Sequence, residues 1–128
     1  MTSLRHFTAL GLATISSPAL AGPVQPFSNS ALHAAQAAGK SVLVEVHADW
    51  CPTCRRQDPI VSEIARDPAF AKLVILKLDF DTQVAEEHAL GVNRQSTLIA
   101  FHGTRETQRA TGVTDRDQIR ALAASALR

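Results

Sequence analysis

Short apolar runs recur along the chain and predict the strands of an α/β domain. Residues 42–46, Val-Leu-Val-Glu-Val, are mostly apolar and β-branched, which is typical of a strand covered on both faces. Residues 73–80 and 97–101 have the same character and predict two further strands. A turn at 102–105 leads into 106–110, a polar alternating run that predicts an edge strand.

The segments between these runs carry apolar residues at helical spacing and predict helices. Ser28 or Ser30 is expected to cap the first helix, and Asp81 or Thr82 the third. The resulting order α-β-α-β-α-β-β-α predicts an α/β fold with a mixed central sheet flanked by helices on both faces. The expected helices are residues 31–38, residues 55–66, a segment that ends at Leu90, and residues 118–127, with a short helical turn at 69–72.

The first 21 residues have the composition of an export signal peptide. A basic start and a short apolar core at 7–15 precede small residues up to Ala21, after which a signal peptidase would cleave. An ordinary N-terminal helix is the alternative. We expect residues 22–30 to be a linker and 31–128 to be the domain. Export predicts a periplasmic location, where oxidising conditions let a disulfide persist.

The composition is that of one globular domain: 128 residues, 45% of them hydrophobic and 20% charged. The 13 basic and 12 acidic residues nearly balance, so the chain has no electrostatic footprint for nucleic acid or an anionic membrane. It also has no apolar stretch long enough to span a bilayer. We therefore expect a monomer with no nucleic-acid partner and no stable membrane insertion after cleavage.

The only two cysteines, Cys51 and Cys54, lie in a Trp-Cys-Pro-Thr-Cys motif between a predicted strand and a predicted helix. The first sulfur of such a pair lies at a helix N-terminus, where free N–H groups and the helix dipole favour a thiolate. The two sulfurs can also close a small disulfide ring. A redox dithiol is the favoured interpretation. Half of a zinc site and inert packing are the alternatives, although no further pair of zinc ligands is apparent.

The order of elements, with Ala-Asp-Trp-Cys-Pro-Thr-Cys at 48–54, resembles thioredoxin over essentially the whole segment 31–127. Pro59 matches the proline that kinks the family's active-site helix. Glu45 matches the family's buried carboxylate six residues before the first cysteine, and Lys77 matches the lysine that faces it. The resemblance implies a thioredoxin-like fold and disulfide exchange with protein partners, with no cofactor and no resident metal.

Three features depart from the family pattern. Pro52 and Thr53 replace the Gly-Pro between the cysteines, and His47 replaces a common aromatic residue. Ser96 lies where a cis-proline normally faces the cysteines. Because a cis bond before a non-proline residue costs about 2.5–4 kcal/mol, we expect a trans bond before Ser96. Serine there restores an N–H and adds a hydroxyl, both potentially within reach of Cys51 or a docked peptide.

The residues of the motif suggest a division of roles. Cys51 is expected to be the nucleophile and Cys54 the resolving thiol. Glu45 lies in an apolar strand, where burial should raise its pKa and suit it to exchange a proton with Cys54. A structural ion pair between Glu45 and Lys77 is the alternative. His47 shares a strand face with Glu45 and is either a core residue or a group that tunes the thiols.

Four further residues are candidates for contact with a partner protein. Trp50 is expected to cover the site as a contact surface, with packing as the alternative. By the resemblance, Ser96 and Thr97 lie in the loop that faces the cysteines, and Gly112 matches the glycine that flanks the active-site groove.

The favoured function is an exported thiol–disulfide oxidoreductase acting on protein partners. We expect a reductase supplied by a membrane electron donor, because the chain lacks room for the helical insertion of the dedicated periplasmic disulfide oxidases. Two alternatives remain: a periplasmic carrier that holds Cu(I) between the two cysteines, and a redox-inert binding domain on the same fold.

Overall fold

The computed structural model describes residues 24–128, so the signal peptide expected at 1–21 lies outside the described residues. No helix in the described part is long and apolar enough to cross a membrane. The strands are β1 (Gln25–Pro26), β2 (Ser41–His47), β3 (Leu73–Asp79), β4 (Thr97–His102) and β5 (Arg105–Thr111). The helices are α1 (Asn29–Ala37), α2 (Pro52–Arg66), α3 (Val84–Leu90) and α4 (Arg116–Ser125), with a short 3-10 helix, η1 (Pro68–Phe70).

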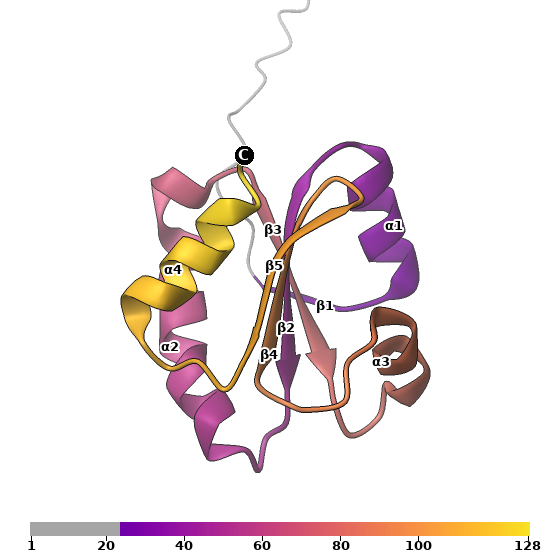
Figure 1. The fold of residues 1–128 in the computed structure, drawn as a ribbon, viewed down its shortest axis with the longest axis vertical. Coiled ribbons are helices and arrows are strands. Elements are labelled where there is room, and N and C mark those ends of the chain that lie inside the picture. The colour runs from indigo at the N-terminus through magenta and orange to yellow at the C-terminus, as the bar shows by residue number, and fades with distance from the viewer. Residues whose placement is uncertain (1–23) are drawn as a thin grey trace, which may run out of the picture.

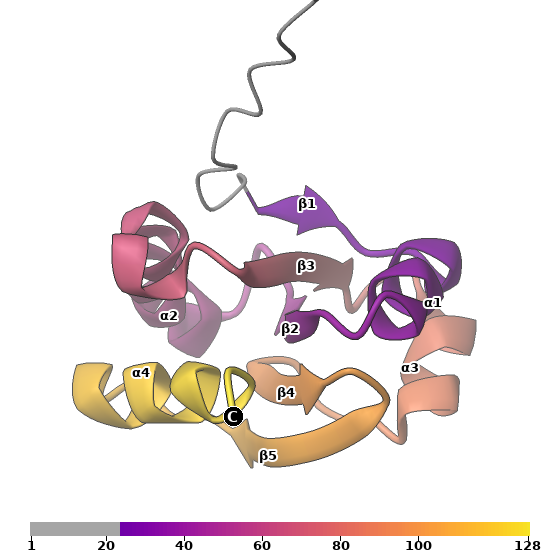
Figure 2. The same cartoon turned by 90° about the horizontal axis from the view of Figure 1, so that it is seen from above.

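The five strands form one sheet in the order β1-β3-β2-β4-β5. Strands β1, β3 and β2 run parallel, whereas β4 is antiparallel to β2, and β5 to β4. Helices α2 and α4 cover one face of the sheet, and α1 and α3 lie on the other side (Figures 1 and 2). The expected mixed sheet with helices on both faces is therefore confirmed.

Strand β2 is central, and all seven of its residues are buried. Its side chains alternate between two cores, as the period of a strand requires. One core lies under α2 and α4 and includes Leu43, whereas the other lies under α1 and includes Val42 and Val44. Glu45 and His47 share the face of Leu43 by the same alternation, so both point to the side covered by α2.

The segment expected to be a linker contributes to the sheet. Gln25 and Pro26 form β1, which pairs with β3 at the sheet edge, where a proline costs no ladder bond. Phe27 follows, with its side chain buried and its N–H donating to Lys77 O at 2.8 Å. The chain then enters α1, which Ser28 caps by accepting from the N–H of Ala31. Residues 24–30, part of the segment expected to be a linker, are therefore packed against the domain.

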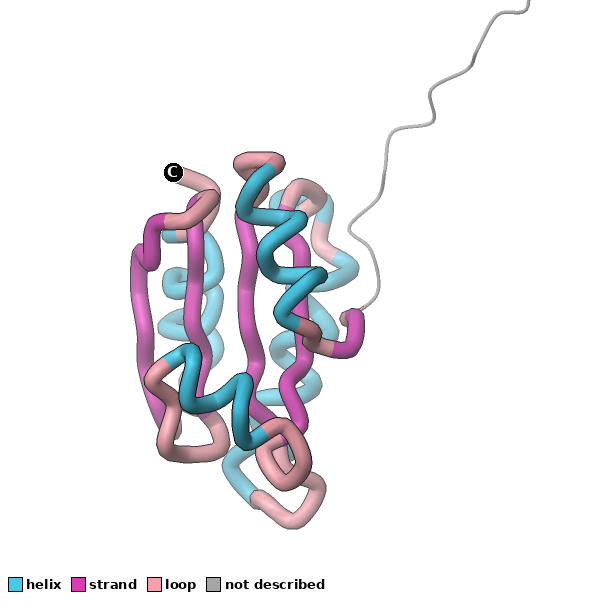
Figure 3. Tube along the Cα trace, turned by 90° about the vertical axis from the view of Figure 1, so that its right-hand side faces the viewer, coloured by secondary structure: helices cyan, strands magenta, loops and turns pink. Residues whose placement is uncertain are grey.

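The expected cap of α3 by Asp81 or Thr82 is wrong. The N-cap residue is Gln83, and its side chain makes no capping bond. Instead, the Gln83 side chain accepts from the N–H of Asp79 and donates to the carbonyl of Phe27. The Asp81 carboxylate accepts from the indole of Trp50. The side chain of Asp81, one of the two expected caps, is therefore engaged by Trp50 and not by the N-terminus of α3. The tube in Figure 3 shows the loops around α3 at the lower end of the strands.

Candidate active site

Both cysteines lie at the start of α2, beyond the end of the central strand. Cys51 is the N-cap residue and Pro52 takes the first helical position, which suits proline because no N–H is needed there. The Cys51 sulfur accepts from the N–H of Cys54 at 3.1 Å. Both cysteines are free thiols and each is 1% exposed. The strand-to-helix junction thus directs backbone donors at the first sulfur.

The two thiols differ in acidity. Burial alone would raise the pKa of Cys51, but hydrogen bonds from the Cys54 thiol, the N–H groups of Cys54 and Thr53, and the Ser96 side chain bring it below its ordinary value. Burial raises the pKa of Cys54 to about 11, assisted by its hydrogen bond to Cys51. The Cys54 thiol also lies 3.9 Å from the carbonyl oxygen of Val46. Cys51 is therefore the more easily ionised sulfur, and Cys54 the one that keeps its proton.

The loop at Ser96 packs against this pair with a trans peptide bond, as expected, since residues 24–128 contain no cis bond. Ser96 has a left-handed backbone with φ of +55°. Its N–H donates to Val46 O at 2.8 Å, and its carbonyl accepts from the N–H of Gly112 at 2.9 Å. The expectation that the Ser96 N–H reaches Cys51 is therefore wrong, because the carbonyl of Val46 in β2 accepts it. The Ser96 side chain is what acts on Cys51.

Gln57 fixes this loop and was missed at the sequence level. Its side chain is fully buried in α2, and Nε2 donates to Ser96 O at 3.2 Å and to Val113 O at 2.9 Å. Gln57 thus ties α2 to the chain before β4 and after β5. A signal was present, because Gln57 lies four and seven residues before Val61 and Ile64 on the apolar face of the helix.

Glu45 is buried beneath α2, with 2% of its surface exposed. Its pKa is raised to about 8, chiefly by burial and also by a hydrogen bond with Asp58, while the charge of Lys77 opposes the rise. Lys77 is paired with Glu45 in the register of β2 and β3, but its Nζ contacts Asp58 Oδ1 at 3.3 Å. The carboxylate that holds Lys77 is thus Asp58, which the sequence-level interpretation left out.

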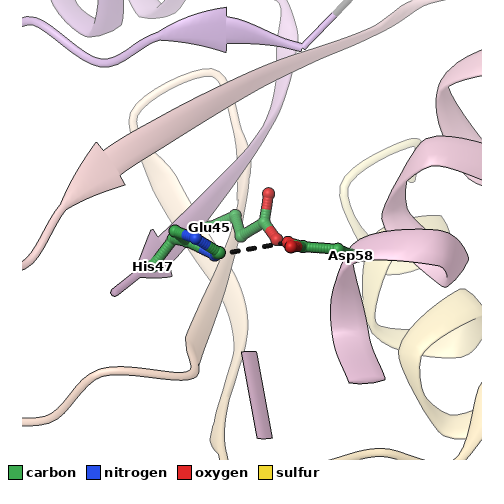
Figure 4. Close-up of side chains that lie close together, drawn as sticks. All are labelled: Glu45, His47 and Asp58. Carbon is green, nitrogen blue, oxygen red and sulfur yellow. Dashed lines mark ion pairs between the residues drawn. The ribbon is translucent and has the colours of Figure 1, made fainter. Parts of the chain in front are cut away.

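His47 joins the same polar group on the α2 side of the sheet and does not pack as an apolar core residue. Its Nε2 lies 3.0 Å from Asp49 Oδ1, and its Nδ1 lies 3.3 Å from Asp58 Oδ1. Figure 4 shows Glu45 and His47 converging from β2 on the side chain of Asp58 from α2. Among residues 24–128, these three form the one group of potential metal ligands, and it does not include the cysteines.

The remaining candidates differ in their access to a partner. Trp50 is 54% exposed, and its indole N–H donates to both carboxylate oxygens of Asp81 at 3.0 Å, so it lies on the surface. Thr97 is buried, and its hydroxyl contacts Arg94 O and the Thr111 hydroxyl. Gly112 has φ of +76°, a conformation that glycine adopts without strain, and bonds to the Ser96 loop.

Comparison with known proteins agrees with this architecture. A family model described as thioredoxin matches residues 24–125. Thioredoxin from Chlamydia muridarum is 33% identical over 78 residues, 61% of this chain and 74% of that protein. Thioredoxin from Alicyclobacillus acidocaldarius is 33% identical over 88 residues, 69% of this chain and 83% of that protein.

Solved structures show the same fold. The crystal structure of Trxlp from Edwardsiella tarda matches with a TM-score of 0.74 and 40% identity, covering 77% of this chain and 97% of that one. A mutant thioredoxin from Halobacterium salinarum matches with a TM-score of 0.73 and 26% identity, over 88% and 96% of the two chains. With its dithiol at the start of α2 and a family match over most of its length, this chain belongs to the thioredoxin family of thiol–disulfide oxidoreductases.

Proposed function

We propose that this protein is an exported reductase of protein disulfides, with Cys51 as the nucleophile. The observation that carries the proposal is the position of the Cys51 sulfur at the N-cap of α2, where it accepts from the N–H of Cys54 and its pKa falls while that of Cys54 rises. The thiol that ionises more readily is the nucleophile of the first step. The neighbouring thiol, which keeps its proton, becomes the nucleophile of the second step.

In the first step, the Cys51 thiolate attacks one sulfur of a partner disulfide. A bond forms between Cys51 and that sulfur, the partner's S–S bond breaks, and the other partner sulfur leaves as a thiolate. In the second step, Cys54 loses its proton and attacks Cys51. The intramolecular disulfide forms, and the partner leaves with both sulfurs reduced and two electrons gained. A membrane donor would then return two electrons to the disulfide.

Glu45 is proposed to take the proton from Cys54 in the second step. Its pKa of about 8 lets it change protonation near neutral pH, which a proton acceptor needs. The carbonyl oxygen of Val46, the residue that follows Glu45 in β2, lies 3.9 Å from the Cys54 thiol. Lys77 opposes the rise in the pKa of Glu45 and thereby supports its ionised form.

Trp50 is proposed to contact the partner, together with the loop at Ser96 and Gly112, while Thr97 supports that loop from within the sheet. The exposure of Trp50 beside Cys51 supports this assignment. The signal-like composition of residues 1–21, with cleavage after Ala21, supports a periplasmic location for a monomeric mature chain.

Single-cysteine variants test the proposal. With a disulfide-containing model protein, Cys54→Ser should accumulate a mixed disulfide, because the resolving thiol is absent, whereas Cys51→Ser should form none. Mass spectrometry under denaturing, acid-quenched conditions measures the adducts. Adducts on Cys51→Ser alone would reverse the two roles. Tightly held Cu(I) in the reduced wild type, without turnover of the model protein, would favour the metal carrier instead.

The direction of electron flow is read from the equilibrium potential of the dithiol in a glutathione series. A potential near that of thioredoxin, about −270 mV, would support reduction, and one near that of a strong oxidant, about −120 mV, would contradict it.

A further inference from the structure

A second polar site lies beside the dithiol, formed by Glu45, His47 and Asp58, which we call the carboxylate–imidazole cluster. One ligand atom from each of the three side chains lies within 4.8 Å of the others. Glu45 and His47 are two positions apart on the same face of β2, and Asp58 reaches them from α2 (Figure 4). Two rigid elements of the core therefore hold all three side chains.

Two atoms of this cluster are buried without a hydrogen-bond partner: Oε1 of Glu45 and Nδ1 of His47. The residues that carry them are only 2% and 9% exposed. Buried polar atoms are nearly always satisfied, and an exception indicates a partner that the protein chain itself does not supply.

The second nitrogen of His47 defines which partner would fit. Nε2 lies 3.0 Å from Asp49 Oδ1, so Nε2 carries the proton that this carboxylate accepts. In neutral His47, Nδ1 then has a lone pair, which lies 3.3 Å from the oxygen of Asp58. Two electron-rich atoms at this distance repel each other unless a proton or a metal cation lies between them. A histidine whose far nitrogen donates to a carboxylate is also the usual arrangement of a histidine that binds a metal.

The space around the cluster accommodates further ligands. A cavity of about 540 Å³ is lined by all three residues together with the oxygen-bearing side chains of Ser62 and Asp79. A bound cation could therefore complete its coordination with water.

Lys77 is the one lysine that lines this cavity, and it neutralises only part of the negative charge of the cluster. Its Nζ contacts Asp58 Oδ1 at 3.3 Å but leaves Glu45 Oε1 and His47 Nδ1 without partners. The Lys77 side chain is 36% exposed, so it can turn toward solvent when another cation binds. Lys77 would thus compete with a metal ion for Asp58, but it does not replace a metal ion at Glu45 and His47.

We propose that the carboxylate–imidazole cluster binds a divalent first-row transition-metal cation, with Zn²⁺ as the best fit. One imidazole nitrogen and two carboxylate oxygens suit zinc, which takes nitrogen and oxygen ligands at about 2.0–2.2 Å. Ligand atoms at tetrahedral positions around zinc are then about 3.3–3.6 Å apart. The separation of 3.3 Å between His47 Nδ1 and Asp58 Oδ1 matches this geometry. The site is distinct from the dithiol, and a metal ion there would exclude Glu45 from proton exchange.

The test uses a double variant, Cys51→Ser with Cys54→Ser, so that no thiol can bind metal. Isothermal titration of this protein with Zn²⁺ should show one equivalent bound. In the same background, His47→Ala and Asp58→Asn should each weaken binding at least tenfold, and Asp49→Ala about 10-fold to 100-fold through the orientation of His47. Lys77→Met should strengthen binding, because the competing charge is removed. The exposed His33→Ala is the matched control and should change nothing.

A second readout needs no substitution in the cluster. The ring nitrogen resonances of His47 in the double variant should shift on addition of one equivalent of Zn²⁺, while those of His33 stay in place. The proposal is overturned if no stoichiometric binding occurs, or if His47→Ala binds Zn²⁺ as tightly as its parent.

Discussion

The buried carboxyl of Glu45 should make the stability of this protein fall steeply as pH rises. The folded state holds its pKa at about 8 against an ordinary value of 4.5, chiefly because burial removes the charged form from water. Replacing it by Gln keeps the shape of the protonated side chain and leaves an amide that can still donate to Asp58. Glu45→Gln should therefore remove the pH dependence without removing the packing.

The size of the effect follows from proton linkage. Between pH 4.5 and 8, the folded state holds a proton on Glu45 that the unfolded state has released. The free energy of unfolding then falls by about 1.4 kcal/mol for each pH unit. This contribution is fully present below pH 4.5 and is lost as pH rises through 8, for a total of about 5 kcal/mol as an upper limit.

Urea unfolding at intervals from pH 4.5 to 9 measures this dependence. The protein should carry the Cys51–Cys54 disulfide, so that no thiol titrates, and the buffers should contain a chelator. We expect the stability of Glu45→Gln to exceed that of the wild type by several kcal/mol at pH 8.5 and to approach it at pH 4.5. Glu106→Gln, at an exposed carboxylate on β5, is the matched control and should follow the wild type. Parallel curves for Glu45→Gln and the wild type would refute the reasoning.

Two further predictions concern the loop that faces the dithiol. Ser96→Ala should raise the pKa of Cys51, because a hydrogen bond to the thiolate is lost; thiolate absorbance titration measures this, and a curve identical to the wild type would leave the hydroxyl without a role. Gln57→Leu should lower the free energy of unfolding by about 1–3 kcal/mol, because the Val113 carbonyl loses its hydrogen bond from Nε2, whereas the Ser96 carbonyl keeps its bond from the N–H of Gly112. Urea unfolding against the exposed control Gln108→Leu tests this, and equal losses in both variants would show that the Gln57 bonds contribute nothing.

Much of the architecture could be predicted because it depends on short-range patterns. The β-branched run at 42–46 identifies the central strand, and the apolar spacing of 55–66 identifies the helix after it. A Cys-x-x-Cys between the two then lies at a helix N-terminus whatever the rest of the chain does, so the acidity of Cys51 follows from three residues of local spacing. Glu45 in an apolar strand likewise predicts a buried carboxyl with a raised pKa.

The sequence did not determine which side chains and carbonyls these buried groups contact. Asp58 reaches Glu45, His47 and Lys77 only because α2 crosses the face of β2 at that angle and depth, and no pattern in 55–66 distinguishes that position from a solvated one. The same packing directs Gln57 to the carbonyls of Ser96 and Val113, which lie 39 and 56 residues further along the chain.

Tertiary structure also determined which acceptor each backbone N–H group bonds to. The N–H of Ser96 is taken by Val46 in the neighbouring strand, and Phe27 anchors a segment whose prolines resemble those of a linker. Such hydrogen bonds form only between backbone groups that packing brings to within about 3 Å of each other. Because the two groups are far apart in the chain, the local sequence around either one does not indicate its partner.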